Sequence, residues 1–210
     1  MHYFKLHAEN PQKRVIDQSV ELLKAGAVMI YPTDSAYALG CALNNRAGVD
    51  IIREIRNLTA NHPMTLICSE LSQVACYATI DDRAFKIMKK LTPGPYTFLL
   101  RATKHISKIA QGCKRKEVGI RIPNHGVALN LVDKLGEPIL SSTLWLPSDE
   151  EPIYDLSNLP MIEQKKVDLI LDSLECRPGA TTIIDLLGAT PKVVRKGFGF
   201  EENDDIEQYL

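Results

Sequence analysis

The most informative stretch of this chain reads Ala27-Val28-Met29-Ile30-Tyr31-Pro32-Thr33-Asp34-Ser35-Ala36-Tyr37-Ala38-Leu39-Gly40-Cys41. Its first five residues form a continuous apolar run, which is typical of a buried strand. Pro32 has no amide proton and therefore ends strand pairing. Thr33, Asp34 and Ser35 then bring three short polar side chains to the carboxyl end of that strand, where open α/β sheets bind ligands. An ordinary turn with capping residues explains the same spacing, so the pattern alone leaves both interpretations open.

Helical and strand patterns alternate on both sides of this stretch. Asn10 and Pro11 suit the cap and first position of one helix, and Asn124 suits the cap of another. A helix over 81–91 is expected to turn Phe85 and Met88 inward. Further helices are expected over 48–57 and 124–136, and strands over 27–31, 64–68, 96–100, 118–122, 138–141, 169–171, 182–184 and 192–194. The alternation predicts an α/β fold, in which one domain over 1–210 has flanking helices on a mixed or parallel sheet.

The composition excludes several classes of protein. With 45% apolar and 24% charged residues in 210, the chain is neither disordered nor fibrous. No apolar run reaches the roughly 20 residues needed to span a bilayer, and the first residues are too short and mixed for a signal peptide. The five cysteines are odd in number and scattered, so neither a disulfide framework nor a zinc site is expected. A reducing cytoplasm and no membrane partner fit these features best.

Charge is strongly segregated along the chain. From Arg83 to Arg121 there are eleven Lys or Arg residues and one acid, Glu117, which gives a net charge of +10 over 39 residues. The tail at about 200–210 holds five acids and no basic residue. The basic segment is either an anion-binding face for phosphate or RNA backbone, or a solvated face that the acidic tail covers. The polar stretch 146–160 reads as a long surface loop, either a functional lid or merely solvated.

Common catalytic motifs are absent from the sequence. There is no G-x-x-x-x-G-K-S/T, no G-x-G-x-x-G, no G-x-S-x-G and no H-E-x-x-H. The five histidines do not pair at ligand spacing, so we expect no metal site built from protein ligands alone. Magnesium carried by the phosphates of a bound ATP stays open. His62 is either solvated or in contact with a ligand, and Tyr37 either fills the core or packs over a base.

Six motifs in order resemble those of the YrdC/YciO family. Residues 32–39 are similar to its signature P-T-D/E-T-x-Y-G-L, although Ser35 and Ala38 replace a threonine and a glycine. The polar details resemble most the YciO branch. The other five matching stretches are Thr92-Pro93-Gly94-Pro95-Tyr96-Thr97, Gly119-Ile120-Arg121-Ile122-Pro123, Pro138-Ile139-Leu140-Ser141-Ser142-Thr143, Thr181-Thr182-Ile183-Ile184-Asp185 and Val194-Arg195-Lys196-Gly197.

The resemblance implies a twisted open sheet with a large, basic, concave face. Catalytic members of the family make L-threonylcarbamoyl-adenylate from threonine, bicarbonate and ATP for tRNA modification, and members bind double-stranded RNA. Carried over by motif, the substrate-binding residues are Thr33, Arg121 and Thr181, and the nucleotide-binding residues are Arg56, Ser141, Thr143 and Arg195.

Two departures from the catalytic pattern bear on activity. The K-x-R motif of the catalytic branch is replaced here by Arg56-Asn57-Leu58, and its S-x-N motif by Thr143-Leu144-Trp145. Losing one hydrogen bond to a charged group costs about 1.5–3 kcal/mol. Since about 1.4 kcal/mol is a factor of ten in rate, two such losses slow a reaction by roughly a hundredfold to ten-thousandfold.

Three functions follow as hypotheses. The first is a protein that binds RNA and nucleotides, linked to tRNA or translation, with weak or absent threonylcarbamoyl-AMP synthase activity. Its partners would be double-stranded RNA or tRNA, ATP or AMP, and L-threonine. The second is an active L-threonylcarbamoyladenylate synthase. The third, an enzyme similar to dihydroxybutanone-phosphate synthase, is disfavoured because that chemistry uses clustered acids and the signature offers only Asp34.

Overall fold

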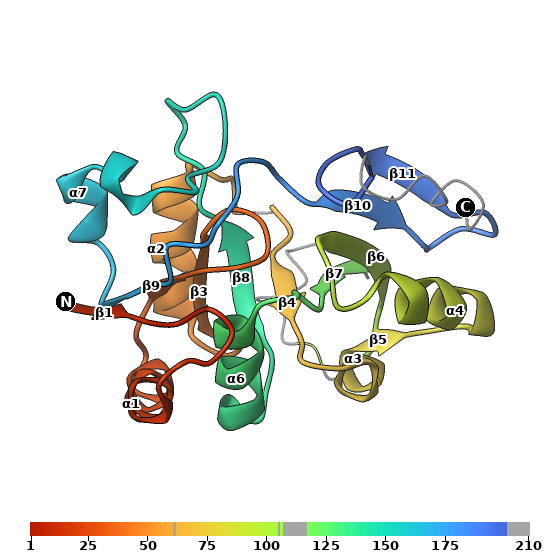
Figure 1. Cartoon of the computed structure of the whole chain (residues 1–210). Helices are drawn as coiled ribbons and strands as arrows, with labels where there is room; N and C mark the ends of the chain where they lie inside the picture. The colour runs from red at the N-terminus through yellow and green to blue at the C-terminus, as the bar shows by residue number, and fades with distance from the viewer. Residues whose placement is uncertain (61, 105, 107–116, 201–210) are drawn as a thin grey trace.

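Eleven strands form one mixed sheet in the computed structural model, which describes residues 1–60, 62–104, 106 and 117–200. Their order across the sheet is β1-β9-β2-β3-β8-β4-β7-β6-β10-β11, and β5 pairs with β6 (Figure 1). The bounds are β1 His2–Lys5, β2 Met29–Tyr31, β3 Ala38–Ala42, β4 Thr65–Ile67, β5 Ala78–Thr79, β6 Tyr96–Ala102, β7 Glu117–Arg121, β8 Ile139–Thr143, β9 Leu169–Asp172, β10 Thr182–Asp185 and β11 Lys192–Arg195.

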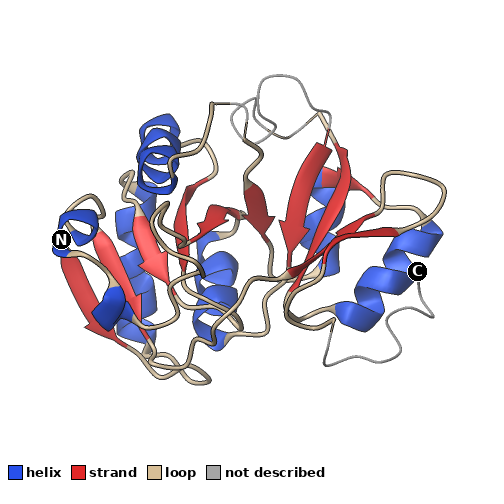
Figure 2. Cartoon of the chain, turned by 90° about the horizontal axis from the view of Figure 1, so that it is seen from above, coloured by secondary structure: helices blue, strands red, loops and turns tan. Residues whose placement is uncertain are grey.

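Helices flank the strands, as the view from above shows (Figure 2). Helices α1 and α6 lie side by side against one face of the sheet (Figure 1). Helix α2 packs on the opposite face against β3. The bounds are α1 Lys13–Lys24, α2 Arg46–Arg56, α3 Leu71–Tyr77, α4 Asp82–Leu91, α6 Gly126–Leu135 and α7 Met161–Gln164, with a 3-10 turn at Leu156–Asn158.

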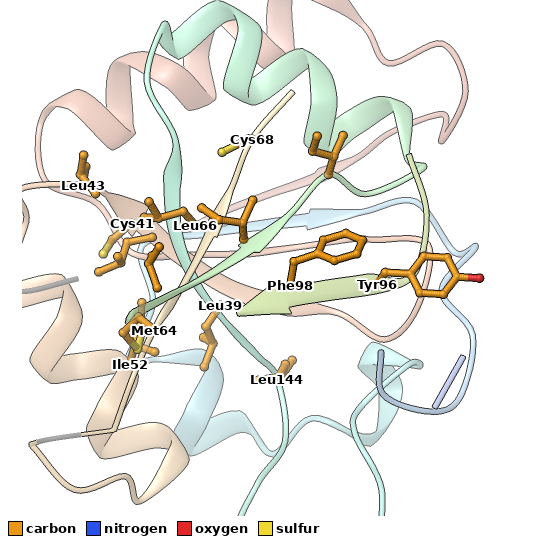
Figure 3. Close-up of a cluster of buried hydrophobic side chains, with 14 of the residues drawn as sticks. Leu39, Cys41, Leu43, Ile52, Met64, Leu66, Cys68, Tyr96, Phe98 and Leu144 are labelled. Carbon is orange, nitrogen blue, oxygen red and sulfur yellow. The ribbon is translucent and has the colours of Figure 1, made fainter. Parts of the chain in front are cut away.

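Alternating side chains along the strands build a core on each face of the sheet. Met29 and Tyr31 of β2 face α1 and α6, whereas Ile30 between them faces the α2 side. This is the two-residue period of a strand. Figure 3 shows Leu39 and Ile52 in the core on the α2 side, where further buried side chains from β4 and β6 join them.

The α/β class, the flanking helices and all eight predicted strand positions are confirmed, but the number of strands was underestimated. Strands β1, β3 and β5 were not predicted. Strand β3 lies at the end of the stretch 27–41, directly after the polar residues for which the sequence predicted a ligand site or an ordinary turn. After Pro32 the chain turns within residues 33–37 and returns as β3, antiparallel to β2. The polar segment therefore ends one buried strand and begins the next.

Three local predictions were wrong. Helix α1 begins at Lys13, not at Pro11, with Gln12 in the capping position. Helix α6 is capped by His125 rather than Asn124, because Nδ1 of His125 accepts a hydrogen bond from the backbone N–H of Val127 at 3.3 Å. Phe85 is 43% exposed, since the buried stripe of α4 runs instead through Ala84, Ile87, Met88 and Leu91.

The segment 146–160 is more than a solvated loop. Leu146, Ile153 and Leu159 are buried in the core on the α2 side. The backbone N–H of Ile153 donates to the carbonyl of Leu144 at 2.8 Å, and its carbonyl accepts from the N–H of Tyr37 at 2.9 Å. The prediction of a surface loop is therefore corrected to a segment anchored on the sheet.

Part of the basic segment between Arg83 and Arg121, residues 105 and 107–116, and the acidic tail 201–210 lie outside the described residues. Among the helices that are described, none has the length and apolar character required to cross a membrane.

Candidate anion-binding site

A short strap, residues 33–37, joins β2 to β3 and turns its polar side chains inward. The hydroxyl of Thr33 donates to the carbonyl of Ala36 at 2.7 Å and accepts from the backbone N–H of Ser35 at 3.2 Å. Thr33 is 0% exposed and Ser35 is 1% exposed. These bonds fix the turn that the chain needs after Pro32, and they leave both hydroxyl oxygens facing the end of β7.

Arg121, the last residue of β7, closes on this strap. Its Nη2 donates to Oγ1 of Thr33 at 3.1 Å, to Oγ of Ser35 at 3.0 Å and to the carboxylate of Asp34. The other carboxylate oxygen of Asp34 accepts from the backbone N–H of Asn124 at 3.0 Å. Arg121 is 5% exposed, so this ion pair lies almost out of water, where charge-assisted hydrogen bonds are strong.

A second arginine, Arg195 at the end of β11, is held by the residue that precedes β10. Its Nε and Nη2 donate to the carbonyl oxygen of Thr181 at 3.0 and 2.8 Å, and Nη2 also reaches Oγ1 of Thr181 at 3.1 Å. The hydroxyl of Thr181 lies 3.0 Å from that of Thr97 on β6. The guanidinium is therefore held by Thr181, whose own hydroxyl is positioned by Thr97 of β6.

A third arginine, Arg56, ends helix α2. Its Nε donates to Oγ of Ser142 at 3.3 Å and its Nη1 to the carbonyl oxygen of Trp145. The guanidinium carbon lies 5.9 Å from the centroid of the Trp145 ring, which is within the range of a cation–π contact. Trp145 therefore both covers and anchors the cation that replaces the family lysine.

Electrostatics link the three guanidiniums into one arginine row, which we define as Arg56, Arg195 and Arg121. Burial and then the charge of Arg195 lower the pKa of Arg56, and burial and then the charge of Arg121 lower the pKa of Arg195. Arginine nevertheless stays protonated in proteins. Asp34 is the one carboxylate that the described structure pairs with this row.

His62 lies beside the same row. Burial lowers the pKa of His62, and the charges of Arg56 and Arg53 lower it further. The imidazole is therefore neutral at pH 7 and offers one donor and one acceptor next to a cation. His62 is nevertheless exposed, which agrees with the solvated interpretation, and contact with a ligand stays a prediction.

The structure brings some of the predicted site residues together and separates others. Thr33 contacts Arg121, and Thr181 contacts Arg195. Ser141 instead bonds within the sheet, to the hydroxyl of Tyr31 at 2.7 Å and to the carbonyl of Leu39 at 2.9 Å. Thr143 is half-buried and pairs with β3 opposite Ala38. The roles of all seven predicted residues in binding stay predictions.

Two polar contacts of the row were missed from the sequence. Thr97, which positions Thr181, stands in the stretch 92–97 that was quoted only for its family motif. Ser142, which binds Arg56, lies between two predicted site residues. Strand alternation turns Ser141 and Ser142 to opposite faces, so the sequence signal was the strand register, which the pattern alone did not fix.

Two cavities flank the strap. One, of about 660 Å³, includes Asp34 and His125 in its lining, and the other, of about 570 Å³, includes Tyr37. None of the seven predicted site residues lines either cavity. Within the described ranges, no three His, Cys, Asp or Glu side chains gather as metal ligands would.

Comparisons with known proteins agree with this architecture. The family model of the Sua5, YciO and YrdC proteins, described as telomere recombination, matches residues 21–197. The chain is 42% identical to YciO of Escherichia coli over 99% of this chain and 98% of that protein. The crystal structure of E. coli YciO superposes with a TM-score of 0.91 at 41% identity, over 100% of this chain and 99% of that one.

More distant relatives are enzymes by name. The threonylcarbamoyl-AMP synthase of Coxiella burnetii is 30% identical over 75% of this chain and 84% of that protein. Sua5 of P. abyssi, crystallised with L-threonine, shares the fold at 22% identity and a TM-score of 0.86, over 100% of this chain and 62% of that one. The chain therefore belongs to the Sua5/YciO/YrdC family, as its six motifs predicted, and is related to the threonylcarbamoyl-AMP synthases.

Proposed function

We propose that this protein binds ATP or AMP through its arginine row and has weak or absent threonylcarbamoyl-AMP synthase activity. The observation that supports this most is the row itself, three neighbouring half-buried or buried guanidiniums with one paired carboxylate, Asp34. Like charges that are partly removed from water repel one another strongly. A polyphosphate relieves that repulsion and supplies several acceptors at once, which is the geometry that arginine matches best.

A further detail supports an anionic guest at this position. The Nε of Arg121 is buried and has no hydrogen-bond partner among the described residues. A buried charged donor left without an acceptor costs free energy, and an oxygen of a bound anion would satisfy it. Magnesium would enter with the phosphates of ATP, as it does where proteins bind it through one or two carboxylates and substrate.

L-Threonine is proposed as a weaker ligand than ATP. The carboxylate of L-threonine would compete with Asp34 for Arg121. Thr33, which the family motif assigns to the substrate, is fully buried, and its hydroxyl already bonds Ala36 and Arg121. Binding of threonine at this position therefore requires some of these contacts to be exchanged.

Weak or absent synthase activity follows from what surrounds Arg56. Transfer to the α-phosphate of ATP depends on cations placed where charge develops in the transition state. Here Arg56 is held by the carbonyl of Trp145, and Leu58 brings no cation to the third position of the motif. The alternative, an active synthase, predicts pyrophosphate release from ATP with bicarbonate and threonine at a rate above that of the Thr33→Ala, Arg121→Ala variant.

Calorimetric titration with ATP, AMP, adenosine and L-threonine tests the proposed binding. We expect affinity to rise with the number of phosphates, because each adds acceptors for the guanidiniums, and we expect adenosine to bind at least about tenfold more weakly than ATP. Equal affinity for ATP and adenosine would show that the base rather than the phosphates is recognised, and would refute the proposal.

Double-stranded RNA is proposed as a second partner, on the exposed lysines of α4. Lys86, Lys89 and Lys90 fall within one turn of that helix, in the most basic part of the sequence. Cations spaced this way neutralise neighbouring phosphates of a nucleic-acid backbone without reading its bases. The family resemblance and this placement support RNA binding through phosphate contacts.

A gel-shift series at increasing salt measures those contacts. The logarithm of affinity is expected to fall with the logarithm of salt concentration, by roughly 0.9 per phosphate contact. Changing Lys86, Lys89 and Lys90 to Gln should reduce that slope by about two to three. The matched control changes Lys5, Lys13 and Lys24, which are exposed elsewhere, and should leave the slope unchanged. A wild-type slope near zero would argue against RNA backbone contacts.

A further inference from the structure

The second cavity beside the strap, which we name the tyrosine cavity, has a lining of unusual character. Its volume is about 570 Å³, within the range of small-molecule sites. Its titratable lining residues are three tyrosines, two aspartates and one cysteine, with no Lys, Arg or His. The full lining is Tyr3, Tyr37, Tyr154, Asp155, Leu156, Ser157, Leu159, Gln164, Ile170, Asp172, Leu174 and Cys176.

Asp172 is the buried carboxylate of this cavity. It is 3% exposed and accepts hydrogen bonds from the hydroxyl of Tyr3, from the hydroxyl of Tyr37 at 2.7 Å and from the backbone N–H of Leu174 at 3.0 Å. All three donors are neutral. Among the described residues Asp172 forms no ion pair, unlike the partly buried Asp34, which has Arg121.

Two tyrosines of the cavity, Tyr3 and Tyr37, stay neutral. Burial and the hydrogen bond to Asp172 raise the pKa of Tyr3 to about 12, and the same two causes raise the pKa of Tyr37. The rings of these two tyrosines therefore keep the phenol form. Neutral aromatic rings beside a carboxylate form the kind of surface that attracts alkylated ammonium groups.

The conformation and exposure of Leu174, which lines the cavity, also support a ligand there. Its backbone has a φ of 60°, the left-handed region that a leucine rarely adopts, and its side chain is 76% exposed. Both features are unfavourable in isolation, and strained residues concentrate where ligands bind. An occupant of the cavity would cover this apolar side chain.

We propose that the tyrosine cavity binds a small organic ammonium cation, with its charge beside Asp172 and its alkyl groups against the exposed rings of Tyr3 and Tyr154 and against Leu174. The site is separate from the arginine row, although the two share the strap. Tyr37 belongs to the cavity, and the thiol of Cys176 lies 3.6 Å from the carbonyl of Thr33. The strap thus contacts the arginine row through Thr33, which bonds Arg121, and the tyrosine cavity through Tyr37, which bonds Asp172.

Choline is a suitable probe, because 3,3-dimethylbutan-1-ol has the same shape without the charge. We expect a titration followed by backbone amide NMR to give saturable shifts at Ser157, Leu174 and Cys176 with choline, and binding at least about tenfold weaker with the neutral alcohol. Equal binding of the two compounds, or no saturable shift with choline at matched ionic strength, would overturn the proposal.

Two variants locate the binding. Asp172→Asn keeps the shape and removes the charge, and we expect it to lose the preference for choline over the alcohol. Because that change also alters a buried network, Tyr154→Ala at the exposed rim is the second variant, expected to weaken choline binding about fivefold or more. Phe85→Ala, an exposed aromatic on α4, is its matched control. Unchanged choline affinity in Tyr154→Ala would contradict the assignment. ATP titration remains an independent readout of the arginine row.

Discussion

The double variant Leu58→Arg, Trp145→Asn is expected to make threonylcarbamoyl-AMP about a hundredfold or more faster than the wild-type chain. Leu58→Arg returns a cation with several donors to the third position of the K-x-R motif. Trp145→Asn removes the indole that lies against Arg56 and returns an amide to the S-x-N position. Each restored hydrogen bond to a charged group is worth about 1.5–3 kcal/mol in the transition state.

The measurement is pyrophosphate release from ATP with threonine and bicarbonate, with the product identified by mass. Leu58→Met and Trp145→Phe, combined in one chain, form the control, since they change the same positions without adding polar groups. A wild-type rate already equal to that of the double variant would mean that these two positions do not limit catalysis, and the active synthase would then be the better description.

The free energy of unfolding is expected to fall by roughly 3 kcal/mol as pH drops from about 6.5 to about 4, through His125 alone. Burial lowers the pKa of His125 to about 4, with smaller opposing effects of Asp34, which raises it, and Arg121, which lowers it. The unfolded chain thus binds the proton first on acidification. Stability is complete above the unfolded pKa and is lost as pH falls towards the folded one.

The hydrogen bonds of His125 explain why the folded state needs the neutral ring. Nδ1 accepts from the N–H of Val127 and so caps α6, and Nε2 lies 3.3 Å from the hydroxyl of Ser173. A proton on Nδ1 would set two donors against each other. His125→Asn preserves a good capping residue that does not titrate. Denaturant unfolding at pH 4 to 7 should show a flatter profile for this variant, and identical slopes would refute the assignment.

The sequence predicted best those elements whose local signals agree. The helix expected over 48–57 is α2, and its apolar residues Val49, Ile52 and Ile55, which recur at helical spacing, are all buried. The helix expected over 124–136 is α6, and Gly136 ends it with a φ of 77°. In such cases the periodicity, the stop residue and the packing indicate one structure, so little depends on distant contacts.

The sequence predictions failed where contacts with residues far along the chain decide between local structures that the sequence fits equally well. Asn124 is the better capping residue by type, yet His125 caps the helix, and the backbone N–H of Asn124 donates instead to Asp34, ninety positions away. Strand β3 was missed because nothing local separates a short apolar strand from a loop. Its pairing with β8, a hundred residues further on, determines the structure.

In the candidate site, too, some contacts could be predicted from the sequence and others could not. Arg121 and Thr33 were expected together only through the family resemblance, and a bond of 3.1 Å joins them. The motif did not specify the strand register, and the register decides which serine of β8 contacts Arg56. The tyrosine cavity escaped notice because its residues come from four separate segments that carry no shared motif.

The central claim is that the arginine row binds the phosphates of one nucleotide, and ATP affinity in the Arg195→Gln variant tests it most directly. The charge of Arg195 acts on Arg56 and that of Arg121 acts on Arg195, so loss of Arg195 should weaken ATP binding about tenfold to a hundredfold while adenosine binding stays unchanged. Arg14→Gln, an exposed arginine on α1, is the control. If Arg195→Gln binds ATP as tightly as the control does, the row is not the nucleotide site.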